Sequence, residues 1–396
     1  MPYSESARIG ILIGADSIVR RRSGVGRMTF EIARAARLSD AIERVDLMMG
    51  GAISPADWLD LGTPPDPPPI RPIPWKVMVG RVPGVQALRQ IKKGGLHRAV
   101  RRLARESGGK TIYHEPNMIA EPIRLPTVVT INDLSWHHDP SWHPVERLDW
   151  IDRHLPRTLR CAGRFVAISE FTKAAIVREL GIAPDRIDVV SLAPAQEFRP
   201  VPQAAGQDVL SRYDLADRHF IFSISTLEPR KNFDRLLSAY MRLPSSLRAT
   251  TPLVIAGGRG WGDVLTHPDA AQAIRDGSIR LLGHIPDGDL VVLCARAAVF
   301  AYVSLYEGFG LPVVEAMATG TPVVASSTTA VGEVADKAGL TVDPMDEQAI
   351  ANAIRSVLDD PALAGQLGRA GLDRAAEYTW ANTVASLVQT WRKTLA

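Results

Sequence analysis

The chain contains 396 residues, of which 46% are hydrophobic and 22% charged, and its net charge at pH 7 is +3. This length exceeds the size at which one hydrophobic core stops growing, so we expect two domains, and the composition argues against intrinsic disorder. The two cysteines, Cys161 and Cys294, argue against a disulfide framework and favour a reducing compartment. The sequence shows no signal peptide and no eighteen-residue apolar run, so we expect a cytoplasmic protein without a membrane span.

Strand and helix patterns alternate along the N-terminal half of the chain. Strands are predicted over 8–13, 45–49, 127–131 and 165–168, and helices over 24–38 and 172–180. This alternation predicts a parallel, doubly wound α/β sheet. The proline-rich run 62–74 interrupts it and is expected to form an exposed, extended loop, because consecutive prolines continue neither a helix nor a central strand.

A glycine-rich loop, SGVGR at 23–27, follows the first predicted strand and opens a helix. Gly24 would let the backbone approach a phosphate group or an acceptor. A dinucleotide-binding Rossmann dehydrogenase is the competing interpretation. The full G-x-G-x-x-G motif is absent, since Thr29 and Phe30 occupy the downstream positions.

Positive charge is concentrated in one segment, where residues 71–110 contain eleven Lys and Arg residues and only one acidic residue, Glu106. Apolar residues are interleaved with the cations, which is typical of a basic amphipathic surface. Three interpretations remain open: an ordinary solvated helix face, a contact with an anionic membrane, and a nucleic-acid surface. Nucleic acid is disfavoured because no aromatic stacking platform or known motif accompanies the charge.

Two short motifs raise the question of a metal site. Adjacent histidines such as those in WHHDPSWH at 136–143 rarely reach one metal, and no further Cys or His spacing completes a site. We interpret Trp136 and Trp142 as apolar walls for an acceptor or as core residues. The D-x-D pattern at 287–289 precedes a predicted helix over 290–297, and a helix cap explains it economically. We therefore expect no metal.

A segment without regular pattern, 191–206, is where we place the link between the domains. Beyond it, residues 220–226 are predicted to form a buried strand, followed by Arg230, Lys231 and a helix over 233–243. The two cations thus stand at the carboxyl end of a strand, where open α/β sheets bind ligands. Such a pair suits a diphosphate, although a solvated basic turn explains it as well.

The most informative segment is YEGFGLPVVE at 306–315. A predicted strand over 299–303 runs into a turn containing Gly308 and Gly310, and Pro312 suits the first position of a helix. The unpaired N–H groups of such a helix start attract anions, so a phosphate is the natural ligand. A turn required only by the chain's geometry is the alternative.

Two carboxylates flank this turn. Glu307 is expected in the loop beside the phosphate, and Glu315 in the first turn of the helix. Carboxylates at these places accept hydrogen bonds from sugar hydroxyls, whereas a favourable helix-dipole interaction would explain Glu315 without a ligand.

Together, STLEPRKN at 225–232 and YEGFGLPVVEAMATGTPVV at 306–324 resemble the C-terminal half of a retaining glycosyltransferase of family 4, a family with a GT-B fold and nucleotide-sugar donors. The similarity is nearly continuous over 220–357 and includes LLGHIPDGDL at 281–290 and GLTVDPMDEQAIANAI at 339–354. It implies two Rossmann-like doubly wound domains that face a central cleft.

The resemblance also implies roles for individual residues. Glu315 would contact the ribose, Glu307 would lie near the sugar without acting as a nucleophile, and Arg230 and Lys231 would hold the diphosphate. Further donor-binding positions that it implies are Gly24, Gly308, Phe309, Gly310, Leu311, Gly283, His284 and Ile285. Many relatives carry an arginine directly after the first strand of the C-terminal domain, where this chain has Ser225-Thr226. More of the phosphate charge must then rest on the two cations.

In the N-terminal half, the resemblance places His114 and Asp133 near the sugar or the acceptor, as further catalytic candidates. His114 is equally explained as a buried histidine at the end of a strand. Asn132 replaces a histidine that many relatives carry, and an amide cannot transfer a proton near neutral pH. Ser169-Glu170 resembles a pair that faces the cleft, with a helix cap as the equal alternative.

We therefore expect an acceptor-binding domain over 1–200, a nucleotide-sugar-binding domain over 201–375, and a C-terminal helix over 376–396 that returns to the first domain. Similarity to bacterial polysaccharide mannosyltransferases favours GDP-mannose as the donor, without a metal cofactor. The acceptor would be a lipid-linked glycan or an oligosaccharide, and the protein would be peripheral on the inner face of the cell membrane. A UDP-sugar donor, a nucleotide-sugar epimerase and a non-catalytic sugar-nucleotide binding protein remain alternatives.

Overall fold

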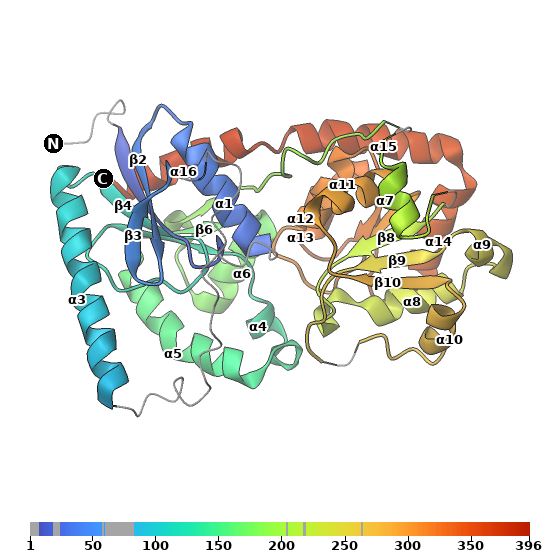
Figure 1. Ribbon diagram of the computed structural model, residues 1–396, viewed down its shortest axis with the longest axis horizontal. Coiled ribbons are helices and arrows are strands. Elements are labelled where there is room, and N and C mark those ends of the chain that lie inside the picture. The colour runs from blue at the N-terminus through green and yellow to red at the C-terminus, as the bar shows by residue number, and fades with distance from the viewer. Residues whose placement is uncertain are drawn as a thin grey trace.

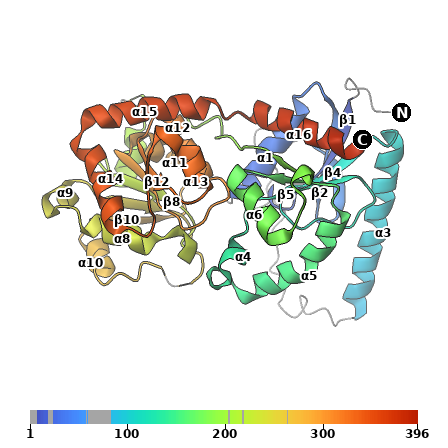
Figure 2. The same cartoon turned by 180° about the vertical axis from the view of Figure 1, so that it is seen from behind.

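The computed structural model describes residues 8–18, 24–57, 59, 83–202, 205–216, 219–262 and 264–396, with side chains omitted for 83–94. These residues form two α/β halves, placed end to end along the long axis of the molecule (Figures 1 and 2). The predicted proline-rich loop at 62–74 and residues 71–82 of the basic segment lie outside the described residues.

The first half is built on a sheet with the order β3-β2-β1-β4-β5-β6-β7. Its strands are β1 Ile9–Gly14, β2 Ile42–Met49, β3 Ala52–Pro55, β4 Thr111–Glu115, β5 Thr127–Ile131, β6 Arg164–Ala167 and β7 Ile187–Val189. The helices around it are α1 Gly24–Arg37, α3 Pro83–Glu106, α4 Ser135–His138, α5 Val145–Cys161 and α6 Glu170–Leu180. All the pairs are parallel except β2 with β3, which form a hairpin. This edge strand was not predicted, although Gly50 and Gly51, both at positive φ, are typical of a two-residue hairpin turn.

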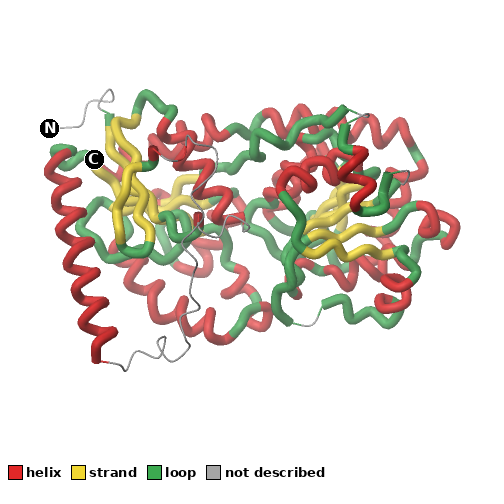
Figure 3. Tube along the Cα trace, viewed as in Figure 1, coloured by secondary structure: helices red, strands yellow, loops and turns green. Residues whose placement is uncertain are grey.

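The second half is built on a fully parallel sheet with the order β10-β9-β8-β11-β12-β13. Its strands are β8 Ile221–Ile224, β9 Leu253–Ala256, β10 Ile279–Gly283, β11 Val299–Tyr302, β12 Val323–Ser326 and β13 Leu340–Val342. Helices enclose both faces of the sheet (Figure 3), which is why β9, β11 and β12 are buried along their whole length. These helices are α7 Gln207–Arg212, α8 Phe233–Met241, α9 Ser245–Thr250, α10 Ala270–Arg275, α11 Asp287–Arg296, α12 Leu311–Ala318, α13 Ala330–Ala335, α14 Glu347–Asp359 and α15 Pro361–Ala376.

Both doubly wound sheets confirm the predicted fold class. In each sheet the strand order reverses beside the first strand of that half, between β1 and β4 and between β8 and β11. Open α/β sheets bind ligands at this reversal, outside the carboxyl ends of the strands. The fold alone therefore predicts a ligand site at the carboxyl ends of β8 and β11.

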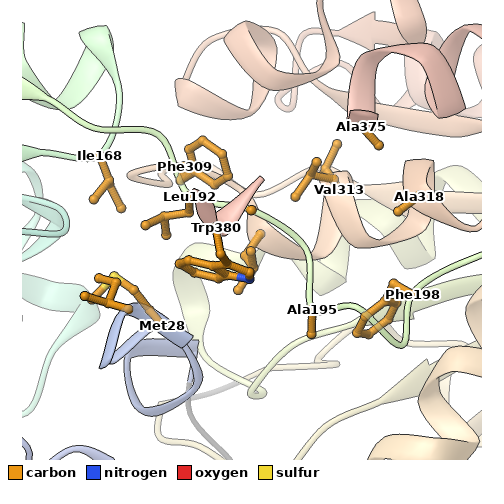
Figure 4. Packing of buried hydrophobic residues seen from close by; sticks show 14 of the residues in the cluster. Met28, Ile168, Leu192, Ala195, Phe198, Phe309, Val313, Ala318, Ala375 and Trp380 are labelled. Carbon is orange, nitrogen blue, oxygen red and sulfur yellow. The ribbon is translucent and has the colours of Figure 1, made fainter. Parts of the chain in front are cut away.

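The chain passes between the halves twice. It crosses first after β7, and α16, Trp380–Leu395, then packs on β4, β5, β6 and α1 of the first half. The Trp380 indole N–H donates to the Pro194 carbonyl at 3.1 Å, which ties the two crossings together. Figure 4 shows Trp380 among buried side chains from both halves, including Met28 and Phe309. The two halves therefore share one continuous hydrophobic cluster.

The described part of α3 has one buried and one exposed face. Leu96, Val100 and Leu103 are buried in the core of the first half, while Arg101 and Arg105 are exposed. An amphipathic helix on the protein's own sheet thus accounts for the pattern of charge over this part of the basic segment. None of the helices in the described ranges has the length and apolar character required to cross a bilayer.

Candidate active site

A cluster of charged side chains lies where the second sheet reverses its strand order. Arg230 and Lys231 follow β8 in a short 3-10 turn, and Glu307 follows β11, its neighbour in the sheet. Parallel neighbours end at the same edge, so the fold brings together residues that lie far apart in the sequence. Arg230, Lys231 and Glu307 therefore lie together at the carboxyl ends of β8 and β11, as the strand and turn patterns predicted.

Glu307 is the centre of this cluster. Its Oε2 atom accepts a hydrogen bond from Arg230 Nη1 at 3.0 Å, and its Oε1 atom accepts from the Tyr302 hydroxyl at 2.8 Å and from Lys231 Nζ. Arg230 also forms an ion pair with Glu228 at 2.8 Å. Burial by itself would raise the Glu307 pKa, but Lys231 and Arg230 outweigh it and lower that pKa to about 2. Glu307 is thus a permanent carboxylate, and the two cations contact it directly.

The turn after Glu307 has the glycine geometry that the motif predicts. Gly310 has a φ of 98° and immediately precedes α12, which begins at Leu311 with Pro312 in its first turn. A side chain at 310 would be strained in this conformation and would contact Val331. The backbone of Phe309, Gly310 and Leu311 therefore forms the start of α12, where N–H groups attract anions.

Glu315 lies just beyond the first turn, one residue further into the helix than predicted. It is the fifth residue of α12, because the helix begins at Leu311 and not at Pro312. Its side chain is 4% exposed, and its Oε1 atom accepts a hydrogen bond from Arg27 Nη1 at 2.6 Å. Burial raises the Glu315 pKa to about 6, although Arg27 opposes this shift.

Arg27 is a residue that the sequence analysis did not single out. It belongs to α1 of the first half, whereas Glu315 belongs to α12 of the second. Its guanidinium also lies 3.3 Å from Asp287. The only local sign of its importance was its place at the end of the SGVGR loop, since nothing in the sequence pairs it with either carboxylate.

The first half of the chain also contacts the turn that carries Glu307. The hydroxyl groups of Ser169 and Thr172 donate to the Gly308 carbonyl at 2.8 Å and 3.0 Å. Ser169 Oγ also caps α6 by accepting from the backbone N–H of Thr172, so both interpretations of Ser169 apply. The turn that carries Glu307 is therefore held from the first half by the start of α6.

Asn132 and Asp133 also lie against Gly308, since a Cβ atom at that position would overlap the Asn132 carbonyl oxygen and lie 3.1 Å from Asp133 Cβ. Asp133 Oδ1 accepts from the backbone N–H and the hydroxyl of Ser135 at 3.1 Å and 2.8 Å. Asn132 Nδ2 donates to the Pro116 carbonyl at 2.9 Å, which uses one of its two amide hydrogens. The structure thus places Asp133 beside the Glu307 turn, with Asn132 directly before it.

His114 is not in this site, which corrects the expectation that it is catalytic. It is fully buried within β4, and its Nε2 atom is 2.8 Å from Thr130 Oγ1. The ring packs edge-on against Trp391 of α16, with the centroids 5.6 Å apart. Burial lowers the His114 pKa to about 3, so the imidazole is neutral at physiological pH. A ring enclosed in this way touches no substrate, and the core interpretation is the right one.

The other predicted donor-binding positions lie at two different places. Gly24 is exposed at the start of α1, and a Cβ atom there would meet nothing within 4 Å. Gly283 ends β10 at a φ of 64°, Ile285 is buried and His284 is exposed. Gly283 also lines a cavity of about 450 Å³ at the carboxyl ends of β8, β9 and β10. The described residues that line it are Leu227, Ile255, Gly257, Arg259, Gly260, Gly262, Val264, Leu265, Thr266, Leu281 and Gly283.

The D-x-D motif at 287–289 is not a helix cap, which corrects the expectation that it caps a helix beginning at residue 290. Helix α11 begins at Asp287, and the residue before it, Pro286, provides no side-chain cap. Asp289 instead accepts from Arg212 and from the Tyr213 hydroxyl, each at 2.7 Å. The motif therefore packs α7 against α11.

The histidine-rich segment forms aromatic and polar contacts. His143 Nε2 is 3.0 Å from Ser135 Oγ, and the His138 ring lies 5.0 Å from that of Tyr306. Trp136 is a core residue with 8% exposure, whereas Trp142 packs against His138 and Tyr306 at the contact between the halves. Among the residues that the structure describes, no group of three or more His, Cys, Asp and Glu side chains is placed to hold a metal ion.

Comparison with known proteins gives consistent matches in both halves. Residues 23–193 match the model described as Glycosyltransferase Family 4, and residues 213–374 match the model described as Glycosyl transferases group 1. Over 282 residues the chain is 38% identical to O-antigen chain mannosyltransferase B of Escherichia coli, covering 71% of this chain and 74% of that protein.

A second relative and a solved structure extend this pattern. The serotype-specific mannosyltransferase WbdA of Escherichia coli is 30% identical over 245 residues, which is 59% of this chain and 29% of that longer protein. Sucrose-phosphate synthase from Thermosynechococcus elongatus superimposes with a TM-score of 0.69 at 20% identity, covering 98% of this chain and 99% of that one. The structural match shows a shared fold.

Proposed function

The chain belongs to glycosyltransferase family 4 and has the GT-B fold, and from this premise we propose that it transfers mannose from GDP-mannose to a growing polysaccharide or lipid-linked glycan. The observation that carries the proposal is the cluster of Glu307, Arg230 and Lys231 beside the start of α12. The names of the two relatives from Escherichia coli support mannose as the sugar.

In the proposed reaction, the bond between the anomeric carbon and the diphosphate oxygen breaks, and the acceptor oxygen bonds to that carbon on the same face. The acceptor's proton passes to the leaving phosphate. Because the donor carries its diphosphate in the α configuration and the acceptor attacks on the same face, the linkage formed is α. Negative charge therefore grows on the diphosphate in the transition state. Preorganised donors aimed at such charge usually supply the largest catalytic term.

Lys231 and Arg230 supply such donors. The ammonium group of Lys231 has three N–H bonds. Two of them donate to Tyr302 and Glu307, and we propose that the third donates to a phosphate oxygen. The guanidinium of Arg230 has five, of which Nη1 serves Glu307 and the Tyr306 carbonyl. Glu307 fixes both cations in place, and its charge stabilises a cationic sugar ring.

We propose that these cations and the N–H groups at the start of α12 neutralise the diphosphate without a divalent ion. N–H groups at helix starts and basic side chains bind phosphate, and their electrostatic interaction with it is stronger in a site from which water is excluded. Both points support the proposal. Turnover in the presence of a chelator should equal turnover without it. A requirement for Mg²⁺ or Mn²⁺ would overturn this part of the proposal.

A transfer assay tests the function directly. The protein is incubated with radiolabelled GDP-mannose and with lipid-linked glycan from bacterial membranes, and label should enter the lipid fraction. Nuclear magnetic resonance of the product should then show the α configuration. Transfer from labelled UDP-glucose instead would overturn the donor assignment. Conversion of the nucleotide sugar without an acceptor would indicate an epimerase, and binding without turnover would indicate a binding protein.

A further inference from the structure

Arg27 connects the two halves of the protein at the carboxylate expected to bind ribose. It projects from the first turn of α1, and its Nη1 atom lies 2.6 Å from Glu315 Oε1 in α12. Its Nη2 atom lies 3.3 Å from Asp287 in α11. Its guanidinium lies 5.9 Å from the ring centre of Phe198, which belongs to the segment between β7 and α7 that crosses from the first half to the second, called the crossing segment below. One side chain of the first half therefore contacts two helices of the second half and the segment that joins the halves, and the contacts with α11 and α12 break if the halves separate.

Glu315 depends on this contact because its surroundings otherwise disfavour its charge. The groups that face it are Arg27 from α1, Asp287 and the buried Cys294 from α11, and Glu197 from the crossing segment. Burial raises the Glu315 pKa to about 6, and Asp287 and Glu197 act in the same direction. Arg27 alone among these groups lowers it. Without the guanidinium, a larger fraction of Glu315 would be protonated near neutral pH.

A carboxylate can contact Arg27 and a ribose at the same time. Its two oxygens offer about four acceptor positions when it is ionised, and Arg27 occupies one of them on Oε1. The others are sufficient for two neighbouring hydroxyl groups. Protonation removes acceptor capacity and converts one oxygen into a donor, so the ionised form is the one that suits a diol.

We propose that Arg27 is a positioning residue for the nucleotide, which keeps Glu315 ionised and oriented toward the two ribose hydroxyls and thereby makes donor binding depend on contact between the two halves. This inference rests on the proposed function, because it takes Glu315 as the ribose contact. When the halves separate, Arg27 leaves with α1 and Glu315 becomes a weaker acceptor. The donor is therefore bound most tightly by the closed arrangement.

Titration calorimetry of the full-length protein tests the proposal. The probes are GDP, UDP, 2′-deoxy-GDP and inorganic pyrophosphate, measured against the wild type, R27Q, R27K and E315Q between pH 5 and 8.5. At pH 6.5 the affinity of R27Q for the preferred ribonucleotide should fall roughly 10- to 100-fold, since a hydrogen bond to a charged group is lost. Pyrophosphate has no ribose, and its affinity should stay the same.

The pH profile separates positioning from a general structural role. Wild-type affinity for the nucleotide should rise with pH through about 6. In R27Q the same rise should occur at higher pH, R27K should restore the wild-type midpoint in part, and E315Q should show no such rise. The wild type should prefer GDP to 2′-deoxy-GDP, and R27Q should lose that preference.

R34Q is the matched control. Arg34 lies on the same helix and forms an ion pair at 2.7 Å with the buried Glu31, within the first half. R34Q should bind nucleotides as the wild type does. If R27Q binds the ribonucleotide with wild-type affinity and pH dependence, or weakens pyrophosphate equally, the inference is overturned while the proposed function stands. If the wild type binds neither GDP nor UDP, both are overturned.

Discussion

Gly308 lies against the backbone of Asn132, although the two residues come from opposite halves of the chain. A Cβ atom at position 308 would overlap the Asn132 carbonyl oxygen and crowd the Asp133 side chain. The turn that carries Glu307 therefore meets the first half through a glycine, and any side chain there would force the halves apart.

The first prediction follows from this contact. G308A should lower kcat/KM by about 100-fold or more, because a displacement near 1 Å in an active site costs about this much. Steady-state kinetics measure the effect. G288A is the control, since a Cβ at Gly288 in α11 meets nothing within 4 Å. Wild-type activity in G308A would show that the halves do not close as the structure describes.

The second prediction concerns Lys231. K231A should reduce donor affinity in calorimetry and lower kcat by about 100-fold or more, because it removes a donor to the leaving diphosphate. K393A serves as the control, because Lys393 pairs with Asp188 in the first half, away from the cluster. Unchanged affinity and turnover in a folded K231A protein would remove Lys231 from the phosphate site.

The third prediction concerns acid stability. The Glu307 pKa is about 2 in the folded protein, below its ordinary value of 4.5, so the unfolded chain binds this proton more readily. The resulting stabilisation is complete above about pH 4.5 and is lost as the pH falls toward 2. It amounts to roughly 3 kcal/mol, by the conversion of 1.36 kcal/mol per pKa unit.

Thermal unfolding between pH 2.5 and 7 measures this contribution. E307Q leaves Arg230 and Lys231 buried without their shared carboxylate, so it should be less stable at pH 7 by about 3–5 kcal/mol. Below pH 4.5, the melting temperature of E307Q should then fall less steeply with decreasing pH than that of the wild type. E347Q, which removes a more exposed ion pair with Arg242, should behave as the wild type. Parallel pH curves for E307Q and the wild type would contradict the assignment.

The fourth prediction separates His114 from catalysis. H114A should lower stability by about 2–4 kcal/mol, as expected for truncating a buried ring, with KM and kcat within about threefold of the wild type. The neutral buried imidazole also implies that stability falls as the pH drops from about 6.5 toward 3, since only the unfolded state takes up the proton there. H114A should lose this dependence. A stable H114A protein without activity would return His114 to the list of catalytic residues.

The fifth prediction tests the membrane hypothesis. The double variant R101E/R105E reverses two exposed charges on α3 and should pellet at least tenfold less with vesicles that contain anionic lipid, because each basic residue near such a surface contributes about 1 kcal/mol. R275E/R369E, which changes the net charge equally on the second half, is the control. Equal pelleting of the wild type with neutral and anionic vesicles would reject the hypothesis.

Much of the site could be predicted because its parts are local. The strand, turn and helix around Glu307 and the basic turn at Arg230 each have a pattern within about ten residues, and parallel sheets place such turns at one edge. The limit of this reasoning is visible at His114. The family resemblance placed it near the ligand, but in β4 its ring packs in the core against Trp391 of α16.

The sequence by itself determined the doubly wound sheet of the first half, the glycine turn before α12 and the residues at the carboxyl ends of β8 and β11, because periodicity and turn chemistry are properties of neighbouring residues. Only the tertiary structure decided that Arg27 contacts Glu315, that Ser169 and Thr172 hold the Gly308 carbonyl, and that Asn132 requires a glycine there. Each of these contacts joins the two halves. Their geometry depends on how two independently patterned sheets pack together, and no local pattern in the chain encodes it.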